Sequence, residues 1–187
     1  MEHGEPVAVG LSSQPLCVIE FEVDSIFDIG ASPFGDTRIG YVTGGSFDGE
    51  RLRGRVLPGG GNWSRSGRLG GDASVGTFDA RAVLVTHDGA RIYATYTGRS
   101  RVPDSVRAKF TAADGGESVD RADYYLRIAL VFETSAPAYA WLNGIVAVVI
   151  DVRTHFSLGH RALFRRYEMG WKSVTSVTFP QIPNISA

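Results

Sequence analysis

The chain has little cysteine and no long hydrophobic run, and both absences narrow its class. Cys17 is the one cysteine among 187 residues, which excludes an internal disulfide framework. The longest apolar stretch, residues 144–150, is far too short to span a bilayer. The first ten residues show no basic region followed by an apolar run, as a signal peptide would. We therefore expect a cytoplasmic protein that is held together by core packing.

An excess of charge of one sign is also missing. The 19 basic and 20 acidic residues leave a net charge of -1. No general basic excess favours nucleic acid or an anionic membrane, so neither is expected as a partner. Arg51, Arg53 and Arg55 alternate along one expected strand, and we expect them on a solvated outer face. With 43% hydrophobic residues, the sequence predicts one domain over residues 1–187, with its core at about 16–168 and an extended tail at 172–187.

Segments with helical periodicity are scarce, whereas alternating and β-branched runs punctuated by glycine dominate. Asp48-Gly49 and Asp88-Gly89 are typical of hairpin turns. We expect at most one or two short helices, within residues 103–117 and 136–144. The fold class predicted is all-β, an antiparallel, closed or nearly closed barrel. Its eight expected strands cover residues 16–23, 39–47, 50–57, 77–86, 91–98, 122–134, 145–153 and 161–169.

Two segments between the expected strands read as loops. Residues 28–38 are rich in turn formers, and residues 56–71 run "VLPGGGNWSRSGRLGG". In the second segment Asn62 and Trp63 follow three glycines, so Trp63 either plugs the core or forms an aromatic wall of a cavity. For Trp141 and Asn143 in "WLNG" the same two roles are open, a structural one or a place in the wall of a cavity. Asn143, which precedes a glycine, also suits a turn.

Four motifs follow one another along the chain: "GGSFDGERLRGRVLPGGGNW", "FDARAVLVTHDGARIY", "YYLRIALVFET" and "YAWLNGIVAVV". In this order they resemble the family called domain of unknown function 3237, and the resemblance extends from residue 16 to about residue 168. It implies an antiparallel, lipocalin-like barrel that associates as a homo-oligomer. Some relatives look like cofactor-free enzymes that close oxygen heterocycles by adding a hydroxyl to an alkene. The family usually has Asp before the tryptophan. Asn62 stands there in this chain, and an amide can orient a substrate but cannot act as a general acid.

The candidate catalytic residues come from two strands that have one apolar and one mixed face. Alternation places Asp79 with Arg81, and Tyr125 with Arg127, on the mixed faces. A barrel lumen with a polar end and an apolar floor would show this pattern, so we expect the four side chains to meet inside the barrel. The alternatives are a buried Asp–Arg pair that satisfies only itself, or exposed pairs that contribute little. Next to Arg81, Asp79 suits a base or an anchor better than an acid.

The sequence therefore predicts a cofactor-independent enzyme of secondary metabolism. It would cyclise or isomerise a hydrophobic polyketide- or terpenoid-type molecule in the barrel, for example by intramolecular hydroalkoxylation. The expected catalytic residues are Asp79, Arg81, Tyr125 and Arg127. The expected substrate-binding residues are Asn62, Trp63, Trp141 and Asn143. No cofactor or metal site is expected, because the histidines are scattered and no phosphate-binding loop occurs. A non-catalytic carrier of a hydrophobic small molecule and a filled, purely structural barrel are the alternatives.

Overall fold

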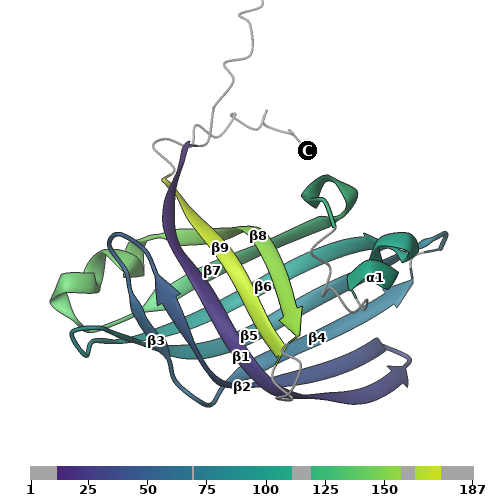
Figure 1. Cartoon of the computed structure of the whole chain (residues 1–187), viewed down its shortest axis with the longest axis horizontal. Coiled ribbons are helices and arrows are strands. Elements are labelled where there is room, and N and C mark those ends of the chain that lie inside the picture. Colours follow the sequence, from purple (N-terminus) through teal and green to yellow (C-terminus); the bar gives the residue numbers. More distant parts are fainter. Residues whose placement is uncertain (1–11, 69, 111–118, 157–162, 174–187) are drawn as a thin grey trace, which may run out of the picture.

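A computed structural model describes residues 12–68, 70–110, 119–156 and 163–173, with side chains described as far as residue 149. The chain forms an antiparallel, barrel-like sheet with one short α-helix and two 3-10 helices (Figure 1). The strands are β1 (Ser12–Ser32), β2 (Gly35–Asp48), β3 (Gly54–Val56), β4 (Gly61–Arg68), β5 (Ala73–Thr86), β6 (Arg91–Pro103), β7 (Tyr125–Glu133), β8 (Val146–Phe156) and β9 (Leu163–Ser173). The helices are α1 (Asp104–Phe110), η1 (Arg121–Asp123) and η2 (Pro137–Gly144).

The strand pairings run around the molecule and return to their starting point. From β1 they pass through β9, β8, β7, β6 and β5, then through β4 to β2, which pairs again with β1. The short strand β3 pairs with the other ends of β2 and β5, so β3 and β4 share the space between these two strands. The all-β antiparallel fold class is confirmed, and the helix expected within residues 103–117 is α1.

Two segments expected as loops are strands instead. Residues 28–38 form the end of the β1–β2 hairpin, in which Asp28 pairs with Arg38 and Ser32 with Gly35. Residues 61–68 form β4, which pairs with β2 on one side and β5 on the other. Serine, arginine and glycine have little intrinsic strand preference, so β4 owes its conformation to these two neighbours. The hairpin expected at Asp88-Gly89 is present, with Val85 opposite Arg91 and a positive φ at Gly89.

The core lies on the concave side of the sheet. Along β5 the side chains of Ala80, Ala82 and Leu84 are buried, while the alternate positions 79, 81 and 83 are exposed. The same alternation continues on β6 and β7, whose inward positions contribute Ile92, Ala94, Tyr96, Ile128, Leu130 and Phe132. The apolar faces therefore face inward, as the burial of hydrophobic area requires.

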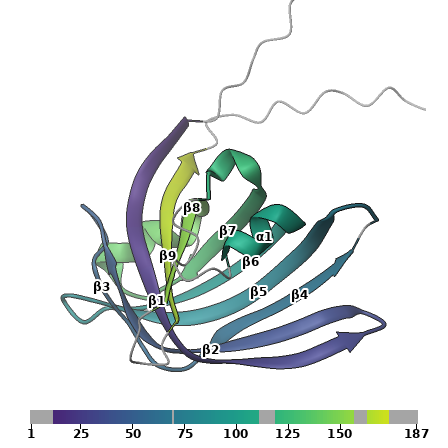
Figure 2. The ribbon, with the colours of Figure 1, turned by 45° about the vertical axis from the view of Figure 1, so that its right-hand side comes forward.

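The two ends of the barrel-like sheet differ. At one end η2 packs its buried residues Tyr139 and Leu142 against the core, near β3 and the β5–β6 turn (Figure 1). At the other end α1 lies beside the end of the β4–β5 hairpin, and the β1–β2 hairpin extends outward apart from it (Figure 2). Arg68 at the end of β4 holds α1 through two hydrogen bonds to Asp104, of 2.6 and 3.3 Å. Within the described ranges, no helix is long and apolar enough to cross a membrane.

Candidate functional site

Asn62 lies in a row of inward-facing residues that crosses the five neighbouring strands β2, β4, β5, β6 and β7. The pairings place it opposite Gly40 on β2 and opposite Ala80 on β5. Ala80 in turn faces Tyr96 on β6, which faces Leu130 on β7. Because side chains alternate along a strand, positions paired in this way share one face of the sheet. Asn62 therefore lies on the interior wall, with the small residues Gly40 and Ala80 on either side.

The side-chain oxygen of Asn62 has no hydrogen-bond partner among the described residues, although it is inaccessible to solvent. Buried polar atoms in proteins almost always have a partner, so an unsatisfied acceptor needs an explanation. Leaving such a group unpaired costs about 1–3 kcal/mol. Asn62 thus carries an unpaired amide oxygen on the interior wall, and a hydrogen-bond donor would reach it only where the neighbouring side chains move aside.

The interior wall becomes more polar and less buried toward the end that carries α1. Inward-facing Ser64 and Ser66 of β4, and Ser100 of β6, are half-buried, whereas Ala80 and Tyr96 are buried. Phe78 is also half-buried there. Its ring packs against the backbone of Gly98, since a Cβ added to Gly98 would lie 3.3 Å from the ring. Solvent therefore reaches this part of the interior, where neutral hydroxyl groups lie beside an aromatic ring.

Tyr96 is the ionisable side chain of the row that contains Asn62. Its strand lies two places from β4, and adjacent strands are about 4.8 Å apart, so about 10 Å separates the two backbones. Tyr96 is 7% exposed, and its ring lies 6.2 Å from that of Phe21 on β1. The Tyr96 phenol and the Asn62 amide are therefore the two polar side chains of this row, whose other members are glycine, alanine and leucine. Tyr96 was not among the sequence candidates.

The prediction that Asp79, Arg81, Tyr125 and Arg127 face the lumen is wrong. Asp79 and Arg81 are exposed on the outer wall and form a 3.1 Å ion pair with each other. Tyr125 is 49% exposed, and the exposed Arg127 lies over its ring at 4.9 Å. Nor do the two pairs meet, because β6 lies between β5 and β7.

The physical reason is that each of these strands has one wholly apolar face. Burying that face in the interior removes far more apolar surface from water than burying the mixed face would. Val83 and Val131, expected to form the apolar floor of a lumen, are 36% and 46% exposed on the outer wall. The two ion and cation–π pairs are therefore surface pairs, which was one of the alternatives.

Trp63 neither plugs the core nor lines the interior. As the neighbour of Asn62 on β4 it points outward, is 38% exposed, and contacts Tyr41 of β2 edge to face, with ring centroids 6.4 Å apart. The glycines before Trp63 are needed for the turn that leads into β4. Gly60 has a positive φ, and a Cβ at this position would lie 2.2 Å from the carbonyl oxygen of Arg81.

Trp141 and Asn143 belong to the end closed by η2. Trp141 is half-buried against the core, and the Arg51 guanidinium lies 4.1 Å from its ring centroid. Asn143 accepts a 2.8 Å hydrogen bond from the Thr134 amide and donates one of 2.9 Å to the Thr134 carbonyl. Its amide is therefore used to fix the β7–η2 connection, which agrees with turn chemistry. Arg51, Arg53 and Arg55 are exposed, as expected.

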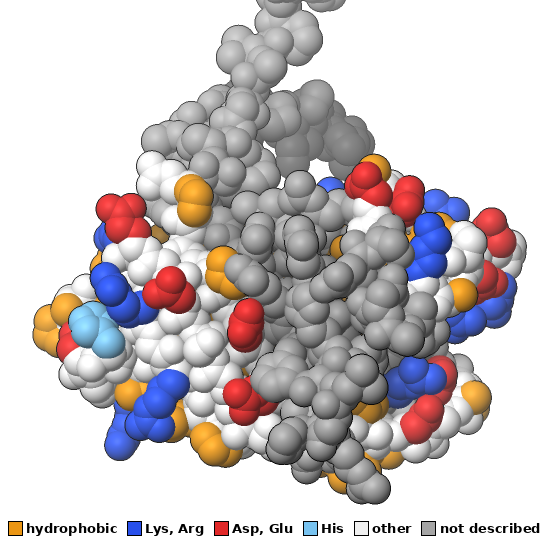
Figure 3. All heavy atoms as spheres, in the orientation of Figure 1, with side chains coloured by type: hydrophobic (Ala, Val, Ile, Leu, Met, Phe, Trp, Pro, Cys, Tyr) orange, Lys and Arg blue, Asp and Glu red, His pale blue; other side chains and the backbone are white. Residues whose placement is uncertain are grey.

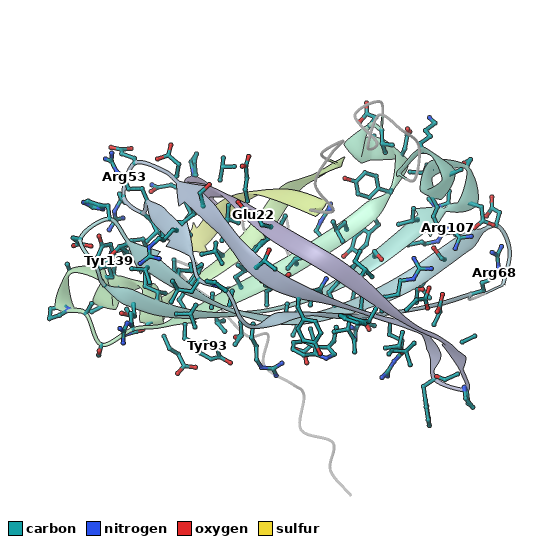
Figure 4. The ribbon with its side chains drawn as sticks, turned by 60° about the horizontal axis from the view of Figure 1, so that its bottom comes forward. Glu22, Arg53, Arg68, Tyr93, Arg107 and Tyr139 are labelled. Atoms are coloured by element: carbon teal, nitrogen blue, oxygen red, sulfur yellow. The ribbon has the colours of Figure 1, made fainter. Side chains whose placement is uncertain are left out.

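A hydrogen-bond network helps to hold the same end together. The buried Thr86 and Tyr139 hydroxyls both donate to Asp88 in the β5–β6 turn, the second at 3.0 Å. These bonds hold the pKa of the Asp88 carboxyl below its usual range, while burial raises the pKa of the Tyr139 phenol. Tyr139 and Arg53 lie at this end in Figure 4, and Arg68 and Arg107 lie at the opposite end.

Outside the sheet, an open depression of about 630 Å³ lies next to the β7–η2 connection. Its lining includes Arg91, Tyr93, Glu133 and Asn143. Tyr93 projects from the outer side of the ribbon (Figure 4), and the depression is separated from Asn62 by the sheet itself. No group of three or more His, Cys, Asp or Glu side chains lies close enough to hold a metal ion in the part of the chain that the structure describes. His155 and His160 lie outside the residues with described side chains.

The fold and the motifs agree with the known proteins to which the chain is similar. A UPF0311 protein from Clostridium acetobutylicum is 36% identical over 107 residues, which are 57% of this chain and 63% of that protein. A solved β-barrel-like protein from Acinetobacter baumannii is 31% identical, with a TM-score of 0.59 over 90% of this chain and 99% of that one. Two further structures share the fold. A conserved protein of unknown function from Rhodopseudomonas palustris has a TM-score of 0.69 at 22% identity, over 88% of this chain and 99% of that one. An enzyme from Penicillium herquei has a TM-score of 0.53 at 19% identity, over 85% and 94%.

The sequence profile of the family described as "Protein of unknown function (DUF3237)" matches residues 11–157. This match covers most of the described sheet, from β1 through β8. The chain belongs to the DUF3237 family.

Proposed function

We propose that the interior of the sheet binds a hydrophobic small molecule that donates one hydrogen bond to Asn62. The observation that carries this proposal is the solvent-inaccessible Asn62 oxygen with no partner among the described residues. A ligand hydroxyl or N–H would satisfy it and regain the roughly 1–3 kcal/mol that an unpaired buried oxygen costs. The apolar residues on the same wall, Ala80, Phe78 and Leu130, suit a ligand whose remaining surface is hydrocarbon.

The polar groups at the end with α1 fit the entrance of such a molecule. Half-buried serines on β4 and β6 give the wall hydrogen-bonding capacity without charge. The charged side chains opposite these serines, Asp36 and Arg38, already form an ion pair with each other, so a neutral ligand is favoured over a charged one that would have to compete with this pair. The substrate class favoured is therefore a neutral, largely apolar molecule with a hydroxyl group, such as a polyketide or a terpenoid.

We further propose that the protein converts this molecule without a cofactor. Adding a hydroxyl across an alkene of the same molecule moves one proton from oxygen to carbon and makes one C–O bond, so it needs no oxidant, reductant or second substrate. Asn62 would hold the hydroxyl, and the Tyr96 phenol on the same row would exchange a proton with the substrate. The likeness in fold to the Penicillium herquei enzyme supports a catalytic use of this fold but names no reaction for this chain.

A probe pair tests the binding step directly. β-Naphthol has the donor hydroxyl, whereas its methyl ether has nearly the same shape and no donor. We expect the protein to bind β-naphthol roughly 5- to 10-fold more tightly, the difference of about one hydrogen bond. Asn62→Leu should abolish this preference, and Thr77→Val on the outer wall should leave it unchanged. Equal affinity of the unmodified protein for the two probes would refute the proposal.

Turnover separates an enzyme from a carrier once a converted substrate is found. Tyr96→Phe keeps the ring and its contact with Phe21 and removes the proton. If the proposal is right, this variant binds the substrate as before and loses roughly a hundredfold or more in kcat. Unchanged kcat in Tyr96→Phe would remove Tyr96 from the mechanism, and binding without any conversion would make the protein a carrier.

A further inference from the structure

The outer wall of β1, β2 and β4 carries a set of aromatic side chains that the core does not use. Phe27, Tyr41 and Trp63 are 51%, 47% and 38% exposed. Their rings touch in sequence, since the Phe27 and Tyr41 centroids are 5.6 Å apart and those of Tyr41 and Trp63 are 6.4 Å apart, both edge to face. We call these three residues the aromatic ladder. It faces away from Asn62, on the opposite side of the sheet.

We propose that the aromatic ladder is the centre of an interface between two copies of this chain. The three rings are already fixed by one another, so little side-chain freedom would be lost on association. Fixed, exposed aromatic residues in a group are typical of the anchor positions of protein interfaces.

The exposed apolar area amounts to more than half of the surface that each partner of a standard dimer buries. A buried aromatic side chain covers about 150–250 Å², so the exposed parts of the ladder amount to roughly 300 Å². Ile29 and Phe34, further along the same hairpin, are 64% and 79% exposed and raise the total to roughly 500 Å². Monomeric proteins rarely expose larger apolar patches than this, and a standard interface buries about 800 Å² on each partner. The surrounding polar residues supply the remainder.

The charges that border the ladder favour a second copy over a membrane surface. Asp79, which pairs with Trp63 across β4 and β5, forms a 3.1 Å ion pair with Arg81. In a two-fold interface each residue of one partner meets its counterpart in reverse order, so Asp79 of one copy can lie against Arg81 of the other. A membrane-binding face would instead need an excess of Lys and Arg. On the visible described surface, basic and acidic side chains are interspersed (Figure 3).

Sedimentation equilibrium of the full chain tests the interface. Its mass is 20.2 kDa, and we expect a dimer of twice that mass at micromolar concentration. Trp63→Glu should raise the dissociation constant roughly thirtyfold or more, because it places a charge at the centre of the interface. Tyr125→Glu is the matched control, since Tyr125 is 49% exposed on the same outer wall but lies on β7, outside the ladder. It should leave the dimer intact.

Hydroxyl-radical footprinting of the unmodified chain provides a readout that does not depend on the folding of a variant. Oxidation of Tyr41 and Trp63 should fall as the protein concentration rises through the dissociation constant, while oxidation of Tyr125 stays constant. A monomer at all concentrations, a dimer that survives Trp63→Glu, or ladder oxidation that is independent of concentration would each overturn the proposal. A monomer that sediments with anionic lipid vesicles would assign the ladder to a membrane instead.

Discussion

Replacing Asn62 by leucine should stabilise the ligand-free protein while it destroys the proposed ligand contact. Leucine has nearly the shape of asparagine and no polar atom, so it removes the unsatisfied oxygen without opening a cavity. An unpaired buried acceptor costs about 1–3 kcal/mol. Because Asn62 as a residue is only half-buried, we take the lower end and expect a gain of about 1 kcal/mol in the free energy of unfolding. For a chain of this length that gain raises Tm by about 2–4 °C.

Ser64→Val is the matched control for this prediction. Ser64 is the next inward-facing residue of β4 and is also half-buried, but its hydroxyl donates a 3.2 Å hydrogen bond to the Arg38 carbonyl. Leucine at position 62 and valine at position 64 both replace a residue of lower strand preference, and at position 64 the loss of this bond offsets that gain. We therefore expect little change in Tm for Ser64→Val.

Urea and thermal unfolding followed by circular dichroism measure both variants, with the naphthol probes measured in parallel. A lower stability of Asn62→Leu would contradict the prediction, because the oxygen must then have had a partner. A Ser64→Val variant stabilised as much as Asn62→Leu would also contradict it, since strand preference alone would then explain the gain. A more stable Asn62→Leu variant that no longer distinguishes the two probes would identify Asn62 as a residue kept for binding at the expense of stability.

Three further predictions concern residues outside the interior wall. Burial raises the pKa of the Cys17 thiol to about 12, so Ellman's reagent should leave Cys17 unmodified at pH 8 unless the protein is denatured. The pKa of Asp88 is lower in the folded than in the unfolded protein, so its contribution to stability is present above about pH 4 and is lost as pH falls through the folded pKa. Tyr139→Phe removes one donor to Asp88 and should lower Tm at pH 7, by a margin that shrinks on acidification. Gly45→Ala should lower Tm by several degrees, because φ is +140° and the new Cβ would lie 2.0 Å from a β1 carbonyl oxygen; Gly67→Ala, with nothing within 4 Å, should not.

The fold could be predicted from the sequence where local chemistry and tertiary structure agree. The alternating runs on both sides of Asp88-Gly89 form the β5–β6 hairpin, and the strands expected at 145–153 and 161–169 overlap β8 and β9. β4 was missed because its strand conformation comes from pairing with β2 and β5, which no local pattern records. The hairpin end at 28–38 was missed for a similar reason, since glycine and proline near its tip are typical of loops.

The candidate site was predicted in part. Asn62 lies on the interior wall, and the signal was its position in the motif that resembles the family. Tyr96 could have been found by extending the alternation of β6 into register with Asn62, but register between strands is not readable from one sequence. Trp63 was assigned to the site because a large aromatic residue next to glycines suggested a cavity wall. Its position on β4 points the side chain outward instead.

The wrong assignment of the mixed faces has a physical explanation that bears on the proposed dimer. A strand face with charges beside valines and aromatic residues looks half-buried, and alternation alone cannot say whether a lumen or a partner buries it. On β5 and its neighbour β4 this face carries Asp79, Arg81 and Trp63, all of them exposed in the single chain. If two copies pack through the aromatic ladder, the half-buried pattern that suggested a lumen is the pattern of an interface. Loss of the dimer in Trp63→Glu, with naphthol binding retained, would separate the two faces: the inner one for the ligand and the outer one for the second copy.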